Sequence, residues 1–508
     1  MNEGREPLEL GAGQPSAPPS ATRPAETRRF CFLQGPHGSF FAELAAALRH
    51  LGHVTLRIGF NISDEAEWDE PGSYIAYTES LDAWPAAIRH LLEEHEISDL
   101  VLYGDARPYH RFAVEAAREA GLRIHFFEEG YLRPYWITYE RDGVNGNSEL
   151  MDIGLDGVDT DRLPDDPTSE IPPARWGELN SHVRHSVTYH IRNHFRNRRY
   201  PNLHRHLPNT PLQDWLYVAK RVFSWPIVQV RRSLRERAVL EGGNPYHLIL
   251  LQLGWDASMR RHSSFSSVAD FMDMCIEAFV AGAPPSDMVV FKTHPLEDGR
   301  EGLERSAMAS AAKHGLAADR VRFIEGGKLA ALIERSKSVV TVNSTAAQQA
   351  LWRGKPVKAL GRAIFAKPGI VSDQPLSAFF AAPNPPDPVL YTTFRRFLLA
   401  TSQIRGGYYR AEGRALVISP AVTAMLSAEG PYQRYLKPLN LATLRAGQGE
   451  GAPAEKVPGE EVSFEEVPSD ALPSEEPPAE NSQSGAAELT PSPVDPAPRA
   501  GRLHTPPR

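Results

Sequence analysis

The sequence predicts an α/β protein built from two Rossmann-like domains that face a cleft, and three observations indicate this class. Short apolar runs alternate with amphipathic helical patterns, which is typical of βαβ units around a parallel sheet. The alternation occurs twice, over residues 28–165 and 244–385. Both ends of the chain lack a hydrophobic period and are rich in Pro, Ala and Glu, so we expect them to be disordered.

The predicted organisation has six parts. In chain order they are a disordered segment 1–27, an N-terminal Rossmann-like domain 28–165, a basic and aromatic helical insert or linker 166–243, a C-terminal Rossmann-like nucleotide-binding domain 244–385, a helical region 386–445, and a disordered acidic, Pro-rich tail 446–508.

Each element of the first domain follows from its pattern. RFCFLQG, from Arg29, is a buried strand, and the helix after it shows apolar residues from Phe40 to Leu51 on one face. The expected elements, strand and helix in turn, are 29–35, 40–51, 54–60, 81–95, 99–105, 110–120 and 123–130.

The second domain repeats the alternation. Its strands are expected at 246–254, 287–295, 321–326, 338–344 and 356–360, with helices near 267–281, 300–314 and from 345. A further helix is expected over 387–400, and we expect it to pack back across the first domain.

The segment between the domains has a different composition. Between Arg175 and Arg237 there are thirteen Lys and Arg against three acids, with six histidines and three tryptophans interleaved. Such a stretch suits the surface of an anionic membrane, where Trp favours the interface. A helical pair that covers the domain junction is the structural alternative. Nucleic-acid binding is disfavoured because no recognition module accompanies the stretch.

The charge of the chain is concentrated in its tail. The formal net charge is −8, and residues 446–508 alone hold twelve acids and four bases, a difference of −8. The rest of the chain is therefore close to neutral, and the overall acidity does not describe its working surface.

The composition also limits the compartment and the chemistry. Cys31 and Cys275 lie in apolar stretches and are expected to be reduced core thiols. No apolar signal-peptide region and no run of about 20 apolar residues is present, which favours a cytoplasmic protein, soluble or peripheral. The histidines lack metal-site spacing, and no phosphate-loop or nucleophile-elbow motif occurs, so no metal cofactor is predicted.

The first candidate site residue is His37, in the run QGPHG at the end of the first strand. The helix after this turn would offer free N–H groups to an anion. A strand-to-helix turn that needs glycine only for its backbone freedom explains the run equally well.

A second candidate group follows the third strand, where Asp105, Arg107 and His110 lie within six residues. Asp105 is either catalytic or the cap of the next helix. Arg107 and His110 are harder to explain structurally, which makes them candidates for acceptor binding or charge stabilisation.

The third group is Glu128-Glu129-Gly130, followed by Arg133. Two adjacent carboxylates are poor β formers, so their place at the end of an apolar strand favours a catalytic role. Neighbouring residues of a strand point to opposite faces, so we expect one carboxylate to face the cleft and the other to anchor the loop.

Two further groups end strands of the second domain. Lys292 and His294-Pro295 would hold a phosphate by charge and hydrogen bonds, although a Lys and a His before a loop need no function. Asn343-Ser344-Thr345 begins a helix, where a hydroxyl either caps the helix or binds an anion. Together the two groups predict a phosphate pocket.

Long segments of the chain resemble the capsule polysaccharide biosynthesis and export family of KpsS/LipB type. The similarity covers about residues 29–435. It is most specific in LQGPHGSFFAELAAALRHLGH and LVLYGDARPYHRFAVEAAREAGLRIHFFEEGYLRPYWITYE, and includes FKTHP, VNST and ATSQIRGGYY.

This resemblance implies an activity. Members of the family are retaining β-Kdo transferases of GT-B-like architecture that use CMP-Kdo as the donor, where Kdo is 3-deoxy-D-manno-octulosonic acid. They begin the poly-Kdo linker of the capsule on a lysophosphatidylglycerol acceptor, beside other capsule synthesis and export proteins. The resemblance thus implies a peripheral enzyme on the cytoplasmic face of the inner membrane, with no metal and no nucleic acid.

The resemblance also assigns roles to residues. The family's acidic, His-Pro and Ser/Thr motifs correspond to Glu128-Glu129-Gly130, His294-Pro295 and Ser344-Thr345, and Gln252 fits a further conserved position. The carboxylate nucleophile carries over best onto Glu129. Arg133 or Arg107 would offset the repulsion between this carboxylate and that of Kdo.

Two rival functions stay open. A nucleotide-sugar epimerase or hydrolase would use the same architecture without a lipid. A non-catalytic export or assembly factor would bind capsule lipid and transporter proteins. The polar residues at the strand ends favour an enzyme, because a scaffold does not need them in a cleft.

Overall fold

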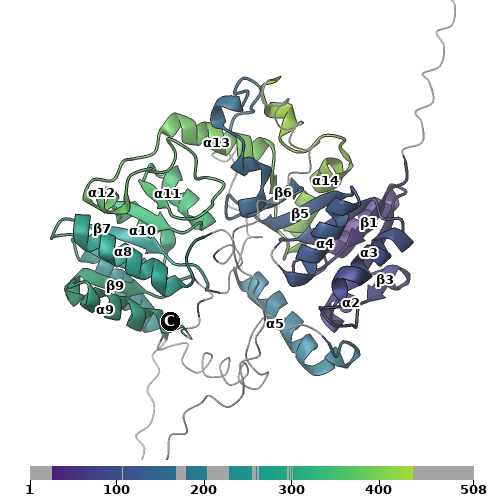
Figure 1. The fold of residues 1–508 in the computed structure, drawn as a ribbon, viewed down its shortest axis with the longest axis horizontal. Coiled ribbons are helices and arrows are strands. Elements are labelled where there is room, and N and C mark those ends of the chain that lie inside the picture. The colour runs from purple at the N-terminus through teal and green to yellow at the C-terminus, as the bar shows by residue number, and fades with distance from the viewer. Residues whose placement is uncertain are drawn as a thin grey trace, which may run out of the picture. The chain divides into compact units, whose positions relative to one another are not determined.

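The computed structural model describes residues 26–438 except for 106, 167–178, 203–227, 255–258, 260–262, 295, 296, 298 and 300. Within this range the predicted fold class is confirmed: two sheets of mainly parallel strands, each with its own helices (Figure 1). Most of the two ends expected to be disordered and the middle of the basic insert lie outside the described residues.

The N-terminal sheet has seven strands in the order β12-β6-β5-β4-β1-β2-β3. Their bounds are β1 (Arg29–Phe32), β2 (Val54–Gly59), β3 (Tyr74–Ala76), β4 (Asp99–Tyr103), β5 (Arg123–Glu129), β6 (Trp136–Arg141) and β12 (Gln403–Arg405). The five strands from β1 to β5 are parallel and follow the order 3-2-1-4-5 of a doubly wound sheet.

Two strands of this sheet were not predicted. β6 pairs with β5 in antiparallel fashion, and β12 pairs with β6 likewise, so the sheet is mixed and not wholly parallel. The physical reason is the short connection over residues 130–135, since a parallel crossover needs a dozen or more residues.

The C-terminal sheet has five parallel strands in the order β11-β10-β7-β8-β9. Their bounds are β7 (Tyr246–Leu250), β8 (Met288–Lys292), β9 (Val321–Ile324), β10 (Ser338–Thr341) and β11 (Val357–Ala359). Counted from β7, the order is again 3-2-1-4-5. Every residue of β7, β8 and β10 is buried, as expected of a parallel sheet covered on both faces.

The helices of the described residues alternate with these strands. They are α1 (Phe40–His50), α2 (Ile62–Ala66), α3 (Trp84–Glu94), α4 (Pro108–Glu119), α5 (Leu179–Arg196), α8 (Val268–Gly282), α9 (Leu303–Lys313), α10 (Leu329–Arg335), α11 (Gln348–Trp352), α12 (Leu376–Ala381), α13 (Pro388–Ala400) and α14 (Ala411–Leu426). Residues 228–241 are also helical.

The C-terminal part of the chain returns to the N-terminal sheet. Helix α13 starts at Pro388 because the Asp387 carboxylate accepts hydrogen bonds from the backbone N–H groups of Val389 and Leu390. Strand β12 then joins β6, and α14 packs on α1. The chain end therefore completes the first domain.

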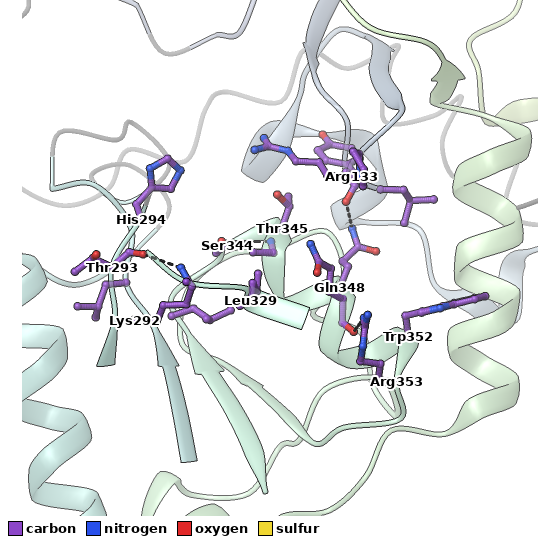
Figure 2. A pocket seen from close by; sticks show the side chains of 18 of the residues that line it. Arg133, Lys292, Thr293, His294, Leu329, Ser344, Thr345, Gln348, Trp352 and Arg353 are labelled. Atoms are coloured by element: carbon purple, nitrogen blue, oxygen red, sulfur yellow. Dashed lines mark hydrogen bonds between the residues drawn. The ribbon is translucent and has the colours of Figure 1, made fainter. Parts of the chain in front are cut away.

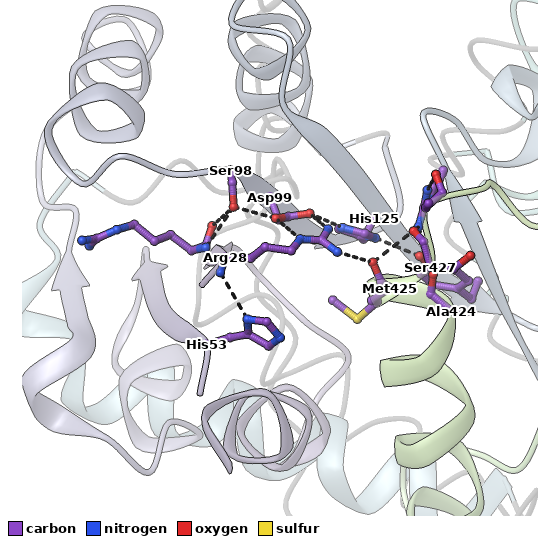
Figure 3. A network of polar contacts seen from close by, with 12 residues as sticks. Arg28, His53, Ser98, Asp99, His125, Ala424, Met425 and Ser427 are labelled. Atoms are coloured by element: carbon purple, nitrogen blue, oxygen red, sulfur yellow. Dashed lines mark hydrogen bonds and ion pairs between the residues drawn. The ribbon is translucent and has the colours of Figure 1, made fainter. Parts of the chain in front are cut away.

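A buried polar network connects α14 to the N-terminal sheet (Figure 3). The Nε of Arg28 donates to Asp99 Oδ2 at 2.9 Å, and another guanidinium nitrogen of Arg28 donates to the carbonyl of Met425 at the end of α14. His125 bonds Asp99 Oδ1 at 2.8 Å, and Arg141 donates to the carbonyl of Ala424 at 3.0 Å. Two arginines thus satisfy carbonyls at the C-terminus of α14, where cations are favoured.

Two expectations about composition can be compared with the structure. Cys31 and Cys275 are both buried free thiols, as predicted. Within the described parts of the chain, no helix combines the length and the apolar character that crossing a membrane requires.

Candidate functional site

The site lies where the strand order of the C-terminal sheet reverses, between β7 and β10. In doubly wound sheets, ligands bind beyond the carboxyl ends of the strands at such a point. Gln252 follows β7 and Asn343 follows β10, and the two side chains are joined by a hydrogen bond of 2.8 Å. Both are buried, so they fix the two loops that border the crevice.

A cavity of about 460 Å³ opens beside this point (Figure 2). Lys292, the last residue of β8, lies at one end of the cavity with Thr293 and His294. Trp352, the last residue of α11, and the following Arg353 lie at the other end. Arg133 and its neighbours from the N-terminal sheet close it from above, and Gln348 Nε2 donates to the carbonyl of Tyr131 at 3.0 Å. We call this space the large cavity.

A second, more polar space of about 150 Å³ adjoins it, which we call the small cavity. Glu128, Glu129, Gln252, Asn343 and Arg362 are among its lining residues. The two cavities have five lining residues in common: Tyr131, Arg133, His294, Ser344 and Thr345. The shared residues make the two spaces one continuous site.

Glu128 and Glu129 are both among the residues that line the small cavity. They are the last two residues of β5, paired with Thr138 and Ile137 of β6, and the chain turns at Gly130 directly after them. That one carboxylate faces the cleft while the other anchors the loop stays a prediction. Only glycine fits this turn, since a Cβ at Gly130 would lie 2.1 Å from the carbonyl oxygen of Trp136.

The two carboxylates have different surroundings. The pKa of Glu128 is raised to about 7, mainly by burial and with the charges of Glu129 and Asp105 acting in the same direction; the hydrogen bond from the Glu129 N–H and the charge of Arg133 act against this rise. Glu129 instead accepts hydrogen bonds from two phenols, Tyr409 at 2.9 Å and Tyr103 at 3.2 Å. Carboxyl pairs with such unlike environments are typical of acid–base assignments in active sites.

The residues of the C-terminal domain that were predicted to bind a phosphate come together, but the helix that follows Ser344 and Thr345 is short. Lys292 is buried, and this burial lowers its pKa to about 8. Ser344 accepts a hydrogen bond from the Ala346 N–H and so caps the three-residue turn before α11. The α-helix after this turn has only five residues, so the hydroxyls and cations, not a long helix, would attract an anion. Pro295 lies outside the described residues.

Asp105 and His110 line neither of the two cavities. Asp105 accepts a hydrogen bond from Asn147 at 2.7 Å. It does not cap α4, whose N-cap residue is Arg107. His110 is buried and bonds the carbonyl of Gly104 at 2.8 Å, which is a structural role for its ring.

Arg107 and His37 also lie outside both cavities. The guanidinium of Arg107 is 5.7 Å from the centre of the Tyr103 ring, and the hydroxyl of Tyr103 donates a hydrogen bond to Glu129. The His37 ring contacts the Tyr189 ring of α5 in a tilted arrangement, with ring centres 4.1 Å apart. Arg133, by contrast, lines both cavities.

Sequence reasoning missed three side chains of the site. Arg362, after β11, lines the small cavity, and Tyr103 and Tyr409 bond Glu129. The signal for Tyr409 was present, because the segment ATSQIRGGYY is one that carries the family resemblance. Arg362 follows a strand end and was accessible to the same reasoning as Lys292.

The described part of the basic insert packs on both domains. Tyr189 of α5 donates to Asp64 Oδ1 at 3.1 Å. In residues 228–241 three arginines form ion pairs with acids: Arg231 with Glu325, Arg235 with Glu304 and Arg237 with Glu241. These pairs offset much of the positive charge of this part of the insert.

Comparisons with known proteins show the family of this chain. The family model described as "Capsule polysaccharide biosynthesis protein" matches residues 98–409. The capsule polysaccharide export protein KpsS of Escherichia coli is 30% identical over 385 residues, 75% of this chain and 97% of that protein. The capsule polysaccharide modification protein LipB of Neisseria meningitidis serogroup A is 31% identical over 388 residues, 74% of this chain and 90% of that protein.

Among solved structures, a β-Kdo 2,7 transferase, KpsC of Thermosulfurimonas dismutans, aligns with a TM-score of 0.38 at 13% identity. It covers 78% of this chain and all of that chain. This likeness is too loose to inform the function. The fold and the site define a two-domain α/β protein with a polar crevice between its sheets. By its match to the family model, the chain belongs to the capsule polysaccharide biosynthesis protein family.

Proposed function

We propose that this chain is a retaining glycosyltransferase that transfers β-Kdo from CMP-Kdo to a lysophosphatidylglycerol-type lipid and so begins the poly-Kdo linker of the capsule. The observation that carries the proposal is the continuity of the two cavities. Glu128 and Glu129 line the small cavity, and residues predicted to bind a phosphate line the large one. The two cavities share five lining residues. A nucleotide sugar has the same order: nucleoside, phosphate, sugar.

In this proposal the CMP moiety occupies the large cavity and Kdo the small one. Lys292, His294 and the Ser344 hydroxyl would bind the phosphate near the junction. Kdo carries a carboxylate next to its anomeric carbon, and Arg133 and Arg362 would offset its charge beside the two glutamates. Within the described residues Arg362 has no ion pair with an acid, so its charge is available to a ligand.

The first chemical step would form a glycosyl-enzyme ester. A carboxylate oxygen of Glu129 attacks the anomeric carbon, the bond from this carbon to the phosphate oxygen breaks, and CMP leaves with the electron pair. The cations of the large cavity stabilise the charge that develops on CMP. Because CMP is a good leaving group, the proposal requires no metal.

The second step would release the sugar to the lipid. The acceptor hydroxyl attacks the same carbon, the ester bond to Glu129 breaks, and Glu128 takes the proton of the hydroxyl. A pKa of about 7 suits a group that exchanges a proton near neutral pH. Two inversions in sequence give overall retention.

A lipid acceptor would bring the protein to the cytoplasmic face of the inner membrane. In support, two helices expose aliphatic pairs spaced by four residues, Val187 and Ile191 on α5 and Val230 and Leu234 in 228–241. Liposome flotation that depends on anionic lipid would support this association, and flotation that is absent with anionic vesicles would refute it.

The test of the function is mass spectrometry of fluorescent lysophosphatidylglycerol after incubation with the protein and freshly generated CMP-Kdo. We expect a single Kdo adduct. Free Kdo and CMP without an adduct would point to a hydrolase. An untouched donor with folded protein would favour a non-catalytic assembly factor, a class consistent with the name of the capsule polysaccharide export protein KpsS.

A further inference from the structure

The Glu129 carboxylate is held by two phenols that belong to distant parts of the chain. Tyr409 Oη donates to Glu129 Oε1 at 2.9 Å across 280 residues of sequence, and Tyr103 Oη donates to the same oxygen at 3.2 Å. No hydrogen bond to the other oxygen, Oε2, occurs within the described residues. One oxygen is thus occupied and the other is left for the small cavity.

The chain is shaped locally to deliver Tyr409. The segment before it passes so close to α14 that a Cβ at Gly406 would lie 2.4 Å from the carbonyl oxygen of Gly413. Gly406 has a φ of +141°, which other residues rarely adopt. The neighbouring Tyr408 donates to the backbone carbonyl of Glu128 at 2.7 Å, so the two tyrosines form hydrogen bonds to two different residues of the acidic motif.

The two phenols remain donors over the working pH range. Burial, and next the charge of Glu129, raise the pKa of Tyr409 and of Tyr103 well above the usual value. Neither phenol therefore competes with Glu129 as a base. Their contribution is geometric, because two donors on one oxygen fix the rotation of the carboxyl group.

We propose that Tyr409, with the help of Tyr103, is a positioning residue that holds Glu129 with Oε2 directed at the reacting carbon. The inference rests on the proposed function and adds to it two residues, Tyr409 and Tyr103, that the sequence analysis did not assign to the site. It also separates the two glutamates, since the Glu128 carboxylate accepts a hydrogen bond from the Glu129 N–H at 3.0 Å, whereas the Glu129 carboxylate accepts from phenols.

The test is Tyr409→Phe, which keeps the ring and removes only the hydroxyl. A hydrogen bond to a charged group, when lost, changes a rate on the order of 10- to 100-fold. We expect kcat for lipid transfer to fall by about this factor, with the KM for CMP-Kdo nearly unchanged, because Tyr409 does not line the large cavity. CMP release without an acceptor should slow in the same proportion, since the first step uses Glu129.

The matched control is Tyr77→Phe, which removes a buried phenol that donates to the Ser80 carbonyl at 2.8 Å, far from the acidic motif in the fold. We expect this variant to keep the wild-type kcat. The inference is overturned if Tyr409→Phe keeps kcat within about threefold of wild type, or loses no more than Tyr77→Phe. A wild-type chain without any transfer would refute the proposed function and this inference with it, whereas an active wild type with an unaffected Tyr409→Phe would refute the inference alone.

Discussion

Gln252 and Asn343 exchange two hydrogen bonds across the reversal of the C-terminal sheet. The Gln252 amide nitrogen donates to Asn343 Oδ1 at 2.8 Å, and its oxygen accepts from the Asn343 N–H at 3.2 Å. The pair joins the loop after β7 to the loop that carries Ser344. The site therefore depends on a contact between residues 91 positions apart.

This contact predicts the effect of Gln252→Leu. The leucine keeps the size of the side chain but removes both hydrogen bonds between Gln252 and the buried Asn343, at a cost of about 1–3 kcal/mol. We expect the Kd for CMP, measured by calorimetry, to rise by roughly tenfold or more. Gln374→Leu is the control, because Gln374 makes its hydrogen bonds in an exposed loop outside both cavities. Equal CMP affinity in the two variants would contradict the prediction.

Replacement of the nucleophile should separate binding from chemistry. Glu129→Gln keeps the shape and the two phenol contacts but cannot form the ester. We expect transfer to fall on the order of 10⁴-fold, as for other nucleophiles, while the affinity for CMP stays the same. The assay is adduct formation by mass spectrometry, with circular dichroism to establish folding. A folded Glu129→Gln protein that retains roughly a tenth of the wild-type transfer rate would exclude Glu129 as the nucleophile.

The dependence on pH follows from two groups of the site. Glu128, with a pKa raised to about 7 by burial, must be deprotonated to accept the acceptor's proton, so activity should rise through this value. Lys292, with a pKa lowered to about 8 by burial, must be protonated to bind the phosphate, so activity should fall above it. Because Lys292 acts in the first step and Glu128 in the second, we expect a bell-shaped pH profile of kcat for the complete transfer between these limits.

Lys292→Arg distinguishes the two limbs. Because a guanidinium stays charged at any working pH, the alkaline limb should move upward while the acidic limb stays in place. An alkaline limb that does not move would mean that another group is responsible for it.

Much of the site could be predicted from the sequence because its polar residues follow apolar strands. Lys292, His294 and Asn343-Ser344-Thr345 were found in this way, and the structure places them along the two adjoining cavities. Asp105, Arg107 and His110 follow a strand in the same way yet line neither cavity, since the direction of a side chain in a loop depends on tertiary contacts such as Asn147 to Asp105.

The missed elements have a common physical cause. β6 and β12 are paired through contacts distant in sequence, and the approach of Tyr409 to Glu129 depends on that pairing. The local pattern of WITYE does not tell a strand that runs antiparallel from one that starts a new crossover. Long-range strand pairing, not local propensity, decides the mixed edge of the N-terminal sheet.

Removal of metal ions tests the proposed chemistry of CMP departure. Cationic side chains, not a bound metal, are proposed to stabilise the leaving phosphate, and among the described residues no group of three or more His, Cys, Asp or Glu side chains is arranged to hold a metal. We expect transfer to continue at the wild-type rate in excess EDTA. A loss of activity with EDTA that Mg²⁺ or Mn²⁺ restores would contradict the proposal.

The Arg28–Asp99–His125 network should govern stability at acid pH. Burial raises the pKa of Asp99, but hydrogen bonds from His125 and Arg28 outweigh it and lower the pKa overall. Burial lowers the pKa of His125 to about 4. Both groups thus bind protons more weakly in the folded chain than in the unfolded one, where His titrates near ~6.5 and Asp near ~3.9.

The sign of the effect follows from this difference. As the pH falls below about 6.5, the unfolded state takes up the His125 proton first, so the free energy of unfolding decreases until about pH 4. Asp99 extends the loss to lower pH. Thermal unfolding between pH 4 and pH 7 should therefore show a melting temperature that rises with pH.

Asp99→Asn tests the contribution of the network directly. It removes the charge that faces Arg28 in the interior, and the loss of one partner of a buried ion pair costs about 3–5 kcal/mol. The melting temperature at pH 7 should fall clearly, and the last turn of α14 should lose protection from hydrogen exchange, because Arg28 also bonds Met425 there. Arg89→Ala is the control, since the pair of Arg89 with Glu119 at 2.8 Å is exposed and should contribute little. If the two variants unfold at the same temperature, the Arg28–Asp99–His125 network does not attach the C-terminal helix to the sheet, and the attachment depends on its other contacts, which include the hydrogen bond from Arg141 and the packing of α14 on α1.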